Sequence, residues 1–297
     1  MADTIGFIGL GVMGAGMARN IAAAGLPLVV TTSSPEKAEA FRAAGATVVA
    51  TPREVAAAAS VVVTCVPDAA ALTGVVSGPG GLAAAPWSGL LVDCSTIAPF
   101  EAREIAGVIA AGGGAMIDAP VSGGAKGANE GTLTIMVGGA EGDVARARSA
   151  LDAMGKAIHH VGPLGAGQAL KACNQLMVAV NLMGACEAVA LARSAGVDPH
   201  MMREVLSTGA ARSGVLEMHA KRYIDHALDG GFRAELMRKD LGIAAAVGAH
   251  EHRAQPATNL AHQLMTAACN AGFAKLDSAA LGLFYDVMNG TRAEDEA

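Results

Sequence analysis

Aromatic and charged residues are scarce in this chain of 297 residues, at 3% and 16%. Few aromatics beside many alanines argue against a β-sandwich and favour closely packed helices. A net charge of −6, with no Lys/Arg block, argues against a nucleic-acid surface, which needs a basic stripe. Hydrophobic residues make up 52% of the chain, enough for one large domain or, as its length favours, two of ordinary size.

The sequence also lacks the cysteine pairs that build disulfide frameworks and metal sites. Its five cysteines include no CxxC pair, so we expect buried thiols in a reducing compartment. The histidines form no HExxH motif, and we assign no metal. The start, MADTIGFIGL, does not resemble a signal peptide, and polar residues interrupt the apolar stretch 172–192. We therefore expect a cytoplasmic protein without nucleic-acid or membrane partners.

Short apolar runs alternate with alanine-rich segments in the first half of the chain. This alternation implies βαβ units and a mostly parallel sheet, and uninterrupted apolar runs are typical of strands covered on both faces. We predict an α/β Rossmann domain with a doubly wound sheet at 1–164, then an all-α domain at 165–297 that begins with a long helix. The expected strands are 4–8, 28–32, 47–50, 60–65, 89–93, 115–118, 133–137 and 158–161; the expected helices of the second half are 168–195, 199–207, 217–223, 236–250, 256–270 and 279–289.

The stretch GFIGLGVMGAGMARN, residues 6–20, contains a G-x-G-x-x-G motif between the first strand and the first helix. In that context the motif indicates a dinucleotide site. Gly9 permits the tight turn, Gly11 lets a pyrophosphate approach the backbone, and Gly14 lets helix and strand pack closely. The helix N-terminus offers N–H groups to the phosphates. We therefore assign the cofactor to the loop residues Gly9, Leu10, Gly11, Val12, Met13 and Gly14.

The end of the second expected strand decides between NAD and NADP, and here it is ambiguous. The stretch 31–36, TTSSPE, has no Asp or Glu at the strand end to bind a ribose 2′-hydroxyl and no Arg to bind a 2′-phosphate. Hydroxyl groups at Thr32 and Ser33 lean slightly toward NADP. Ser34 also fits an ordinary helix N-cap before Pro35.

Two further features suit the oxidation of an alcohol carbon. Ser122, Gly123 and Gly124 could form an anion-binding nest for a substrate carboxylate, although a plain glycine-rich turn is the alternative. Lys171 lies among apolar neighbours on the long helix, and Asn174 follows three residues later on the same face. Burial would disfavour the charged form of the Lys171 amine, as a general acid/base requires; the alternative is a surface lysine.

Four ordered motifs carry a resemblance to a known family: the opening glycine loop, DAPVSGG at 118–124, GAGQALKACNQ at 165–175 and KDL at 239–241. Together they resemble the β-hydroxyacid dehydrogenases, which include 3-hydroxyisobutyrate dehydrogenase and tartronate semialdehyde reductase, and the likeness is strongest to the latter. The resemblance implies hydride exchange between NAD or NADP and a small β-hydroxy acid or its semialdehyde. The chain departs from the pattern at Thr32-Ser33 and at Gln175, where many relatives have Asn.

The resemblance also implies roles for individual residues. Lys171 would be the catalytic acid/base with Asn174 as its partner, and Ser122, Gly123 and Gly124 would hold the substrate carboxylate. We add Arg212 as a hypothetical second anion contact. The remaining implied residues lie at the nicotinamide end (Val66, Pro67, Ser95 and Thr96) or close the site from the second domain (Phe232 and Asp240 toward substrate, Lys239 toward cofactor).

Other functions for such a chain remain open at this point. A dinucleotide-binding sensor or scaffold and an imine reductase share the architecture, but Lys171 argues against both, since such relatives have lost or replaced it. The decarboxylating 6-phosphogluconate enzymes are much longer. The apolar helical half suggests a homodimer or homotetramer.

Overall fold

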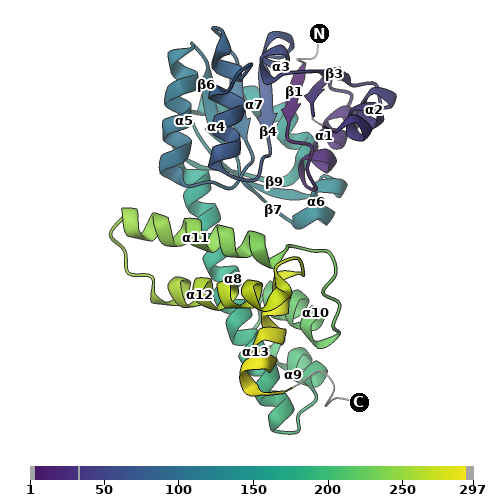
Figure 1. The fold of residues 1–297 in the computed structure, drawn as a ribbon, viewed down its shortest axis with the longest axis vertical. Coiled ribbons are helices and arrows are strands. Elements are labelled where there is room, and N and C mark those ends of the chain that lie inside the picture. The colour runs from purple at the N-terminus through teal and green to yellow at the C-terminus, as the bar shows by residue number, and fades with distance from the viewer. Residues whose placement is uncertain (1–3, 33, 292–297) are drawn as a thin grey trace. The chain divides into compact units, whose positions relative to one another are not determined.

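The computed structural model describes residues 4–32 and 34–291. The chain divides into two compact units, Met1–Lys171 and Ala172–Ala297. The division falls inside helix α8 (Ala166–Ser194), which therefore belongs to both units. The predicted fold class is confirmed, with a mostly parallel, helix-covered sheet in the first unit and helices in the second (Figure 1).

The described part of the first unit contains one sheet of nine strands in the order β3-β2-β1-β4-β5-β6-β8-β7, with β9 pairing to β8. Neighbours from β3 to β6 run parallel, which gives the doubly wound arrangement with its switch point between β1 and β4. The strands are β1 (Ile5–Ile8), β2 (Leu28–Thr31), β3 (Thr47–Val49), β4 (Val61–Thr64), β5 (Leu90–Asp93), β6 (Ala115–Asp118), β7 (Val121–Ser122), β8 (Leu133–Gly138) and β9 (Gly155–Gly162).

Helices cover both faces of this sheet, so central strand residues are buried on either side. Phe7 and Met17 lie in the core under α1 and α7, whereas Val62 and Leu72 lie in the core under α3, α4 and α5. Ser34, Thr51 and Asp68 cap three of the helices through their side chains, as N-cap residues do. The helices are α1 (Gly14–Ala23), α2 (Pro35–Ala43), α3 (Pro52–Ala58), α4 (Ala69–Ser77), α5 (Pro99–Ala111), α6 (Gly124–Glu130) and α7 (Glu141–Met154).

The far edge of the sheet differs from the sequence prediction. The two-residue strand β7 was not predicted, because it lies between Pro120 and a pair of glycines. It pairs antiparallel with β8, which is also antiparallel to β6 through Asp118 and Gly138. Strand β9 begins three residues earlier than predicted and ends one residue later. The edge is therefore mixed, while the cofactor-binding half of the sheet is parallel.

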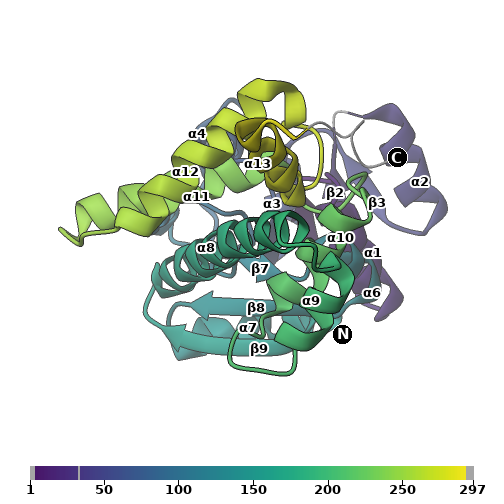
Figure 2. The same cartoon turned by 90° about the horizontal axis from the view of Figure 1, so that it is seen from below.

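The second unit is helical, and α11 and α12 pack side by side in it (Figures 1 and 2). The predicted helix 217–223 is a π-helical turn (Leu216–Ala220) followed by α10, and the predicted helix 256–270 ends in another π-helical turn (Cys269–Phe273). The helices are α8, α9 (Pro199–Leu206), α10 (Lys221–Ile224), α11 (Ala234–His250), α12 (Pro256–Ala268) and α13 (Leu281–Asn289).

Helix α8 is long and apolar enough to span a membrane by length and composition, which is weak evidence for a membrane span. Its residues Leu182, Cys186 and Val189 are buried in the two helical cores of the second unit. These residues form the buried face of α8, which packs against the other helices of the second unit.

Candidate active site

The glycine loop between β1 and α1 has the geometry that a dinucleotide needs. Gly9 has φ = 101°, and a Cβ there would lie 2.3 Å from the Cys65 carbonyl oxygen. A Cβ at Gly14 would lie 2.0 Å from the Gly9 carbonyl oxygen, so α1 starts directly against the turn. No protein atom lies within 4 Å of a Cβ built at Gly11, so the backbone is open on this side. Met13, the N-cap of α1, makes no side-chain cap bond, and the first-turn N–H groups of Ala15 and Gly16 donate to the carbonyl oxygens of Gly11 and Met13.

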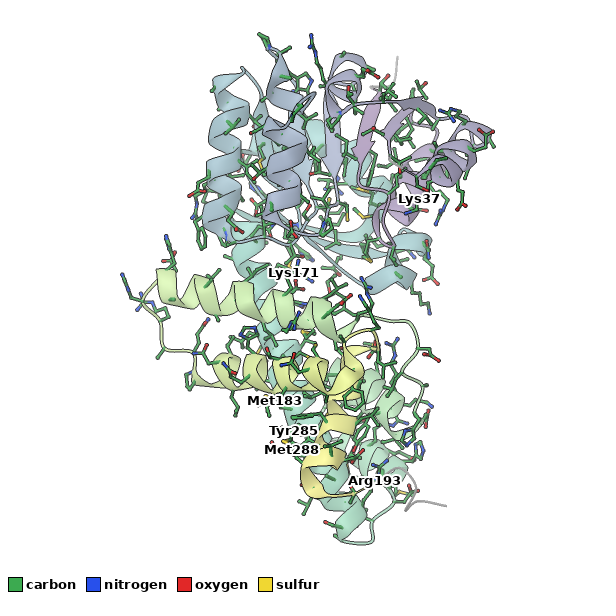
Figure 3. The ribbon with its side chains drawn as sticks, viewed as in Figure 1. Lys37, Lys171, Met183, Arg193, Tyr285 and Met288 are labelled. Atoms are coloured by element: carbon green, nitrogen blue, oxygen red, sulfur yellow. The ribbon has the colours of Figure 1, made fainter. Side chains whose placement is uncertain are left out.

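A cation that the sequence analysis missed lies beside this loop. The Nζ atom of Lys37, in the first turn of α2, donates a hydrogen bond of 2.7 Å to the carbonyl oxygen of Leu10 (Figure 3). The Oγ1 atom of Thr32 accepts from the backbone N–H of Ser34 at 3.2 Å, so this hydroxyl takes part in the turn after β2. Ser33, the other predicted residue here, lies outside the described residues. The cation here comes from the helix that follows β2 and not from the strand end itself.

The carboxyl ends of β4 and β5 are joined by buried hydrogen bonds. The Oδ1 atom of Asp93 accepts from Thr64 Oγ1 at 2.8 Å and from Ser95 Oγ at 2.6 Å. Ser95 Oγ in turn accepts from the backbone N–H of Val66 at 3.0 Å. These bonds hold together the segments that carry Val66-Pro67 and Ser95-Thr96, the four residues predicted at the nicotinamide end. Thr96 and Val66 are half-buried and Pro67 is exposed, whereas Ser95 is buried.

The carboxyl ends of the strands also anchor the start of α8. Both carboxylate oxygens of Asp118, at the end of β6, accept from backbone N–H groups, Oδ1 from Gly165 at 2.6 Å and Oδ2 from Gln168 at 2.7 Å. The Gln168 carboxamide donates to the Ser95 carbonyl oxygen at 2.7 Å and accepts from the Ile97 N–H at 3.2 Å. Burial is the main cause that raises the pKa of Asp118 to about 6, and the two N–H donors oppose it.

Lys171 lies on α8 one turn after Gln168, within the first unit (Figure 3). Only 6% of the residue is exposed, which is rare for a lysine in a soluble protein. Because Gln168 is bonded to Ser95 and Ile97, this turn of α8 is fixed to the carboxyl end of β5. Lys171 is therefore a buried lysine one turn after the anchored Gln168, near the carboxyl ends of the strands, where dinucleotides bind in this fold.

Residues 122–124 form the turn from β7 into α6. Gly123 and Gly124 have positive φ angles of 133° and 62°, which suit glycine, and Ser122 is half-buried. Helix α6 packs on α1, since Asn20 Nδ2 donates to the Ala128 carbonyl oxygen at 2.7 Å. Consecutive backbone N–H groups at such a turn are suited to a carboxylate.

Four polar residues meet in the second unit, three of which were predicted as site residues. Asn174 Nδ2 donates to Gln175 Oε1 at 2.7 Å, and Gln175 Nε2 donates to Asp240 Oδ2 at 2.7 Å. The Nζ atom of Lys239 lies 3.1 Å from Asp240 Oδ1. Gln175 and Asp240 are buried, while Asn174 and Lys239 are half-buried.

Two further predicted residues of the second unit are Phe232 and Arg212. Phe232 packs against the main helical core, and its backbone N–H donates to Asp277 Oδ2 at 3.0 Å. Arg212 is exposed in the loop after α9. Residues 4–32 and 34–291 contain no group of three or more His, Cys, Asp or Glu residues that could hold a metal ion.

Comparison with known proteins agrees with this geometry. Residues 4–162 match the family model for the NAD-binding domain of 6-phosphogluconate dehydrogenase. Residues 165–284 match the model for the NAD-binding region of NADP-dependent 3-hydroxyisobutyrate dehydrogenase. Each half of the chain thus matches a model of nicotinamide dinucleotide binding.

Full-length relatives give the same assignment. The 2-hydroxy-3-oxopropionate reductase of Escherichia coli is 40% identical, with 96% of this chain and 97% of the relative covered. The NAD-dependent L-serine dehydrogenase of Pseudomonas aeruginosa is 37% identical, with coverages of 96% and 99%. The solved structure of Mycobacterium tuberculosis 3-hydroxyisobutyrate dehydrogenase with L-serine has a TM-score of 0.89 at 33% identity, with coverages of 96% and 99%. The chain belongs to the β-hydroxyacid dehydrogenase family and is a nicotinamide-dinucleotide-dependent oxidoreductase that acts on a CH–OH group.

Proposed function

We propose that the protein interconverts a small β-hydroxy acid and its semialdehyde, of the tartronate semialdehyde or 3-hydroxyisobutyrate type. The names of the relatives support this substrate class, since 2-hydroxy-3-oxopropionate is tartronate semialdehyde. The turn at 122–124 would bind the carboxylate that all these acids share, which leaves the rest of the site to distinguish their side groups.

Lys171 moves the proton in this proposal. When bound, the dinucleotide accepts or donates hydride at its nicotinamide ring. In oxidation the neutral Lys171 amine accepts the hydroxyl proton, and in reduction the ammonium group returns a proton to the carbonyl oxygen. Asn174, three residues later on α8, hydrogen-bonds the substrate oxygen. Binding the acid through its carboxylate lowers the entropic cost of bringing it to the reacting groups.

The burial of Lys171 is the observation that carries this proposal. A lysine costs free energy to bury, and a structural lysine would be expected to extend its amine to water. Here the residue is 6% exposed and follows a turn that Gln168 fixes to Ser95. A lysine held out of bulk water in this way is suited to proton transfer.

Replacing Lys171 with alanine tests the proposal. Oxidation of NADH and NADPH is followed at 340 nm with a panel of semialdehydes, and cofactor binding is measured by titration. We expect Lys171→Ala to keep cofactor affinity and to lose at least about 100-fold in kcat, the lower end for a general acid/base. Lys156→Ala, at an exposed lysine of β9, is the control and should behave as wild type. Wild-type turnover by Lys171→Ala would refute the mechanism, and binding without oxidation by the wild-type chain would favour the sensor alternative.

For the cofactor, we infer a preference for NADP. The support is Lys37, whose ammonium group donates a hydrogen bond to the Leu10 carbonyl oxygen. Lys37 follows β2, the strand whose end binds the adenosine ribose in this fold. A 2′-phosphate would gain a charge-assisted contact there, whereas a 2′-hydroxyl would not need a cation.

We also propose a homodimer or homotetramer, built through the helical unit, in the cytoplasm. Apolar side chains are unusually exposed on α8, α9 and α13, which is typical of surfaces that associate. These side chains are Met177, Leu191, Met201, Val205, Val287 and Met288. Light scattering after gel filtration tests the assembly.

A further inference from the structure

The hydrogen-bonded group in the second unit has a direction that its chemistry fixes. Asn174 donates to Gln175, Gln175 donates to Asp240, and the Lys239 ammonium group lies against the other oxygen of Asp240. Both hydrogen bonds therefore run, from donor to acceptor, toward the Asp240 carboxylate. Gln175 and Asp240 are 4% and 3% exposed, so water cannot easily replace a lost partner.

An ionised carboxylate only accepts hydrogen bonds, and this property determines how both carboxamides are turned. Facing Asp240, Gln175 must present its Nε2 group, and its Oε1 atom then faces Asn174. Asn174 must then donate to Gln175 through its Nδ2 group. Its Oδ1 atom is consequently turned away from Gln175. The two ends of an amide are nearly equal in shape, so hydrogen bonds rather than packing decide which way each carboxamide is turned.

We propose that Gln175 is a positioning residue that, with Asp240, orients the Asn174 carboxamide for the reaction. The inference rests on the function proposed above and concerns the same site. In the fixed orientation, Asn174 offers its Oδ1 atom as an acceptor to a donor, either the substrate hydroxyl or the protonated Lys171 amine one turn earlier. The inverted carboxamide would offer N–H groups to those donors and would lose the hydrogen bond.

Exchanging the two polar groups tests the direction rather than the mere presence of these bonds. In Asp240→Asn, the donor-only Lys239 ammonium attracts the new amide oxygen, so the new NH₂ group faces Gln175. Gln175 then turns over, and Asn174 turns over with it. In Gln175→Glu, two carboxylates face each other and repel. In the double variant, the new amide at position 240 donates to the new carboxylate at position 175, and that carboxylate again accepts from Asn174.

The expected result is a loss in each single variant and a recovery in the double variant. We expect Asp240→Asn and Gln175→Glu each to lower kcat about tenfold or more, the effect of losing one hydrogen bond to the reacting groups. The double variant should return to within about threefold of wild type, which corresponds to a residual loss below one such bond. Gln175→Leu should lower kcat as much as Asp240→Asn or Gln175→Glu does. Gln263→Glu, at an exposed position of α12, should keep wild-type kcat.

Three measurements separate this role from a structural one. Cofactor affinity and the Michaelis constant for the acid should change far less than kcat in every variant, and the thermal midpoint should stay well above the assay temperature. The inference is overturned if the single variants keep wild-type kcat or if the double variant is no more active than they are. It is also overturned if kcat falls only in step with the thermal midpoint. Wild-type protein that oxidises neither cofactor with any semialdehyde would instead overturn the proposed function, and this inference with it.

Discussion

The buried Asp118 carboxylate should make the stability of the first unit depend on pH in an unusual direction. Its pKa is raised from 3.8 to about 6, mainly by burial and slightly by the nearby Asp93, against the lowering effect of the Gly165 and Gln168 N–H groups. The folded state therefore binds this proton more tightly than the unfolded state. The stabilising contribution is complete below about pH 4 and is lost as the pH rises through about 6.

The size of the effect follows from the two pKa values. The difference between 3.8 and about 6 corresponds to about 3 kcal/mol in the free energy of unfolding. About 2 kcal/mol of this change falls between roughly pH 4.5 and 7.5. Carboxylates with lowered pKa values, such as exposed Asp225 beside Lys221, act in the opposite direction. The comparison must therefore be made between variants and not on the wild type alone.

Asp118→Asn is the variant that isolates this contribution. The new carboxamide does not titrate, so the difference in unfolding free energy between wild type and variant should shrink by about 2 kcal/mol from pH 4.5 to 7.5. The variant also loses one N–H acceptor, a cost of about 1–3 kcal/mol at every pH. Urea unfolding can be followed by the fluorescence of Trp87, the single tryptophan, which lies in the same unit.

Asp152→Asn, at an exposed position of α7, is the matched control and should follow the wild-type pH dependence. Parallel curves for wild type and Asp118→Asn would refute the reasoning, since they would mean that Asp118 is ionised alike in the folded and unfolded states.

Three further predictions concern other contacts. Lys37→Ala should raise the Michaelis constant for NADPH about tenfold and leave that for NADH nearly unchanged, whereas Arg42→Ala on the same helix should change neither; equal effects on both cofactors would exclude contact with a 2′-phosphate. Gly16→Ala should raise the Michaelis constant for the acid more than that for the cofactor, because its Cβ would lie 2.8 Å from the Ala128 carbonyl oxygen and displace α6; Gly142→Ala, with open space, is the control. Tyr223→Phe should lower the unfolding free energy by about 1–3 kcal/mol in urea titrations followed by circular dichroism, since it removes the hydroxyl between Asp286 and Arg193; an unchanged midpoint would show that these two groups compensate.

The sequence predicted the sheet and most helices because these depend on local patterns. Apolar runs such as 61–64 and the Ser34-Pro35 helix start were recognisable from a few neighbouring residues. The site was predictable where a motif is continuous, as in the glycine loop. The antiparallel edge was not, because β7 has only two residues and depends on its partner β8.

The contacts that join distant parts of the chain could not be read from one sequence. The Asp118 bond to Gln168 joins residues 50 positions apart, and the Gln175 bond to Asp240 joins residues 65 positions apart. No local periodicity encodes such a pairing. Lys37 was not predicted for a different reason, since it lies in the first turn of the helix after β2 and not at the strand end where this fold usually places the ribose-binding residue.

Helix α8 explains how the proposed proton donor and its amide partner keep their spacing. Lys171 belongs to the first unit and Asn174 to the second, yet both lie on one uninterrupted helix, where residues three apart share a face. Their mutual distance is therefore fixed by helix geometry and does not depend on the arrangement of the two units. What each unit adds is orientation: Asp118 and Gln168 hold the first turn, and Asp240 turns the carboxamides through Gln175. A variant at either end should thus alter proton transfer without breaking the helix that carries it.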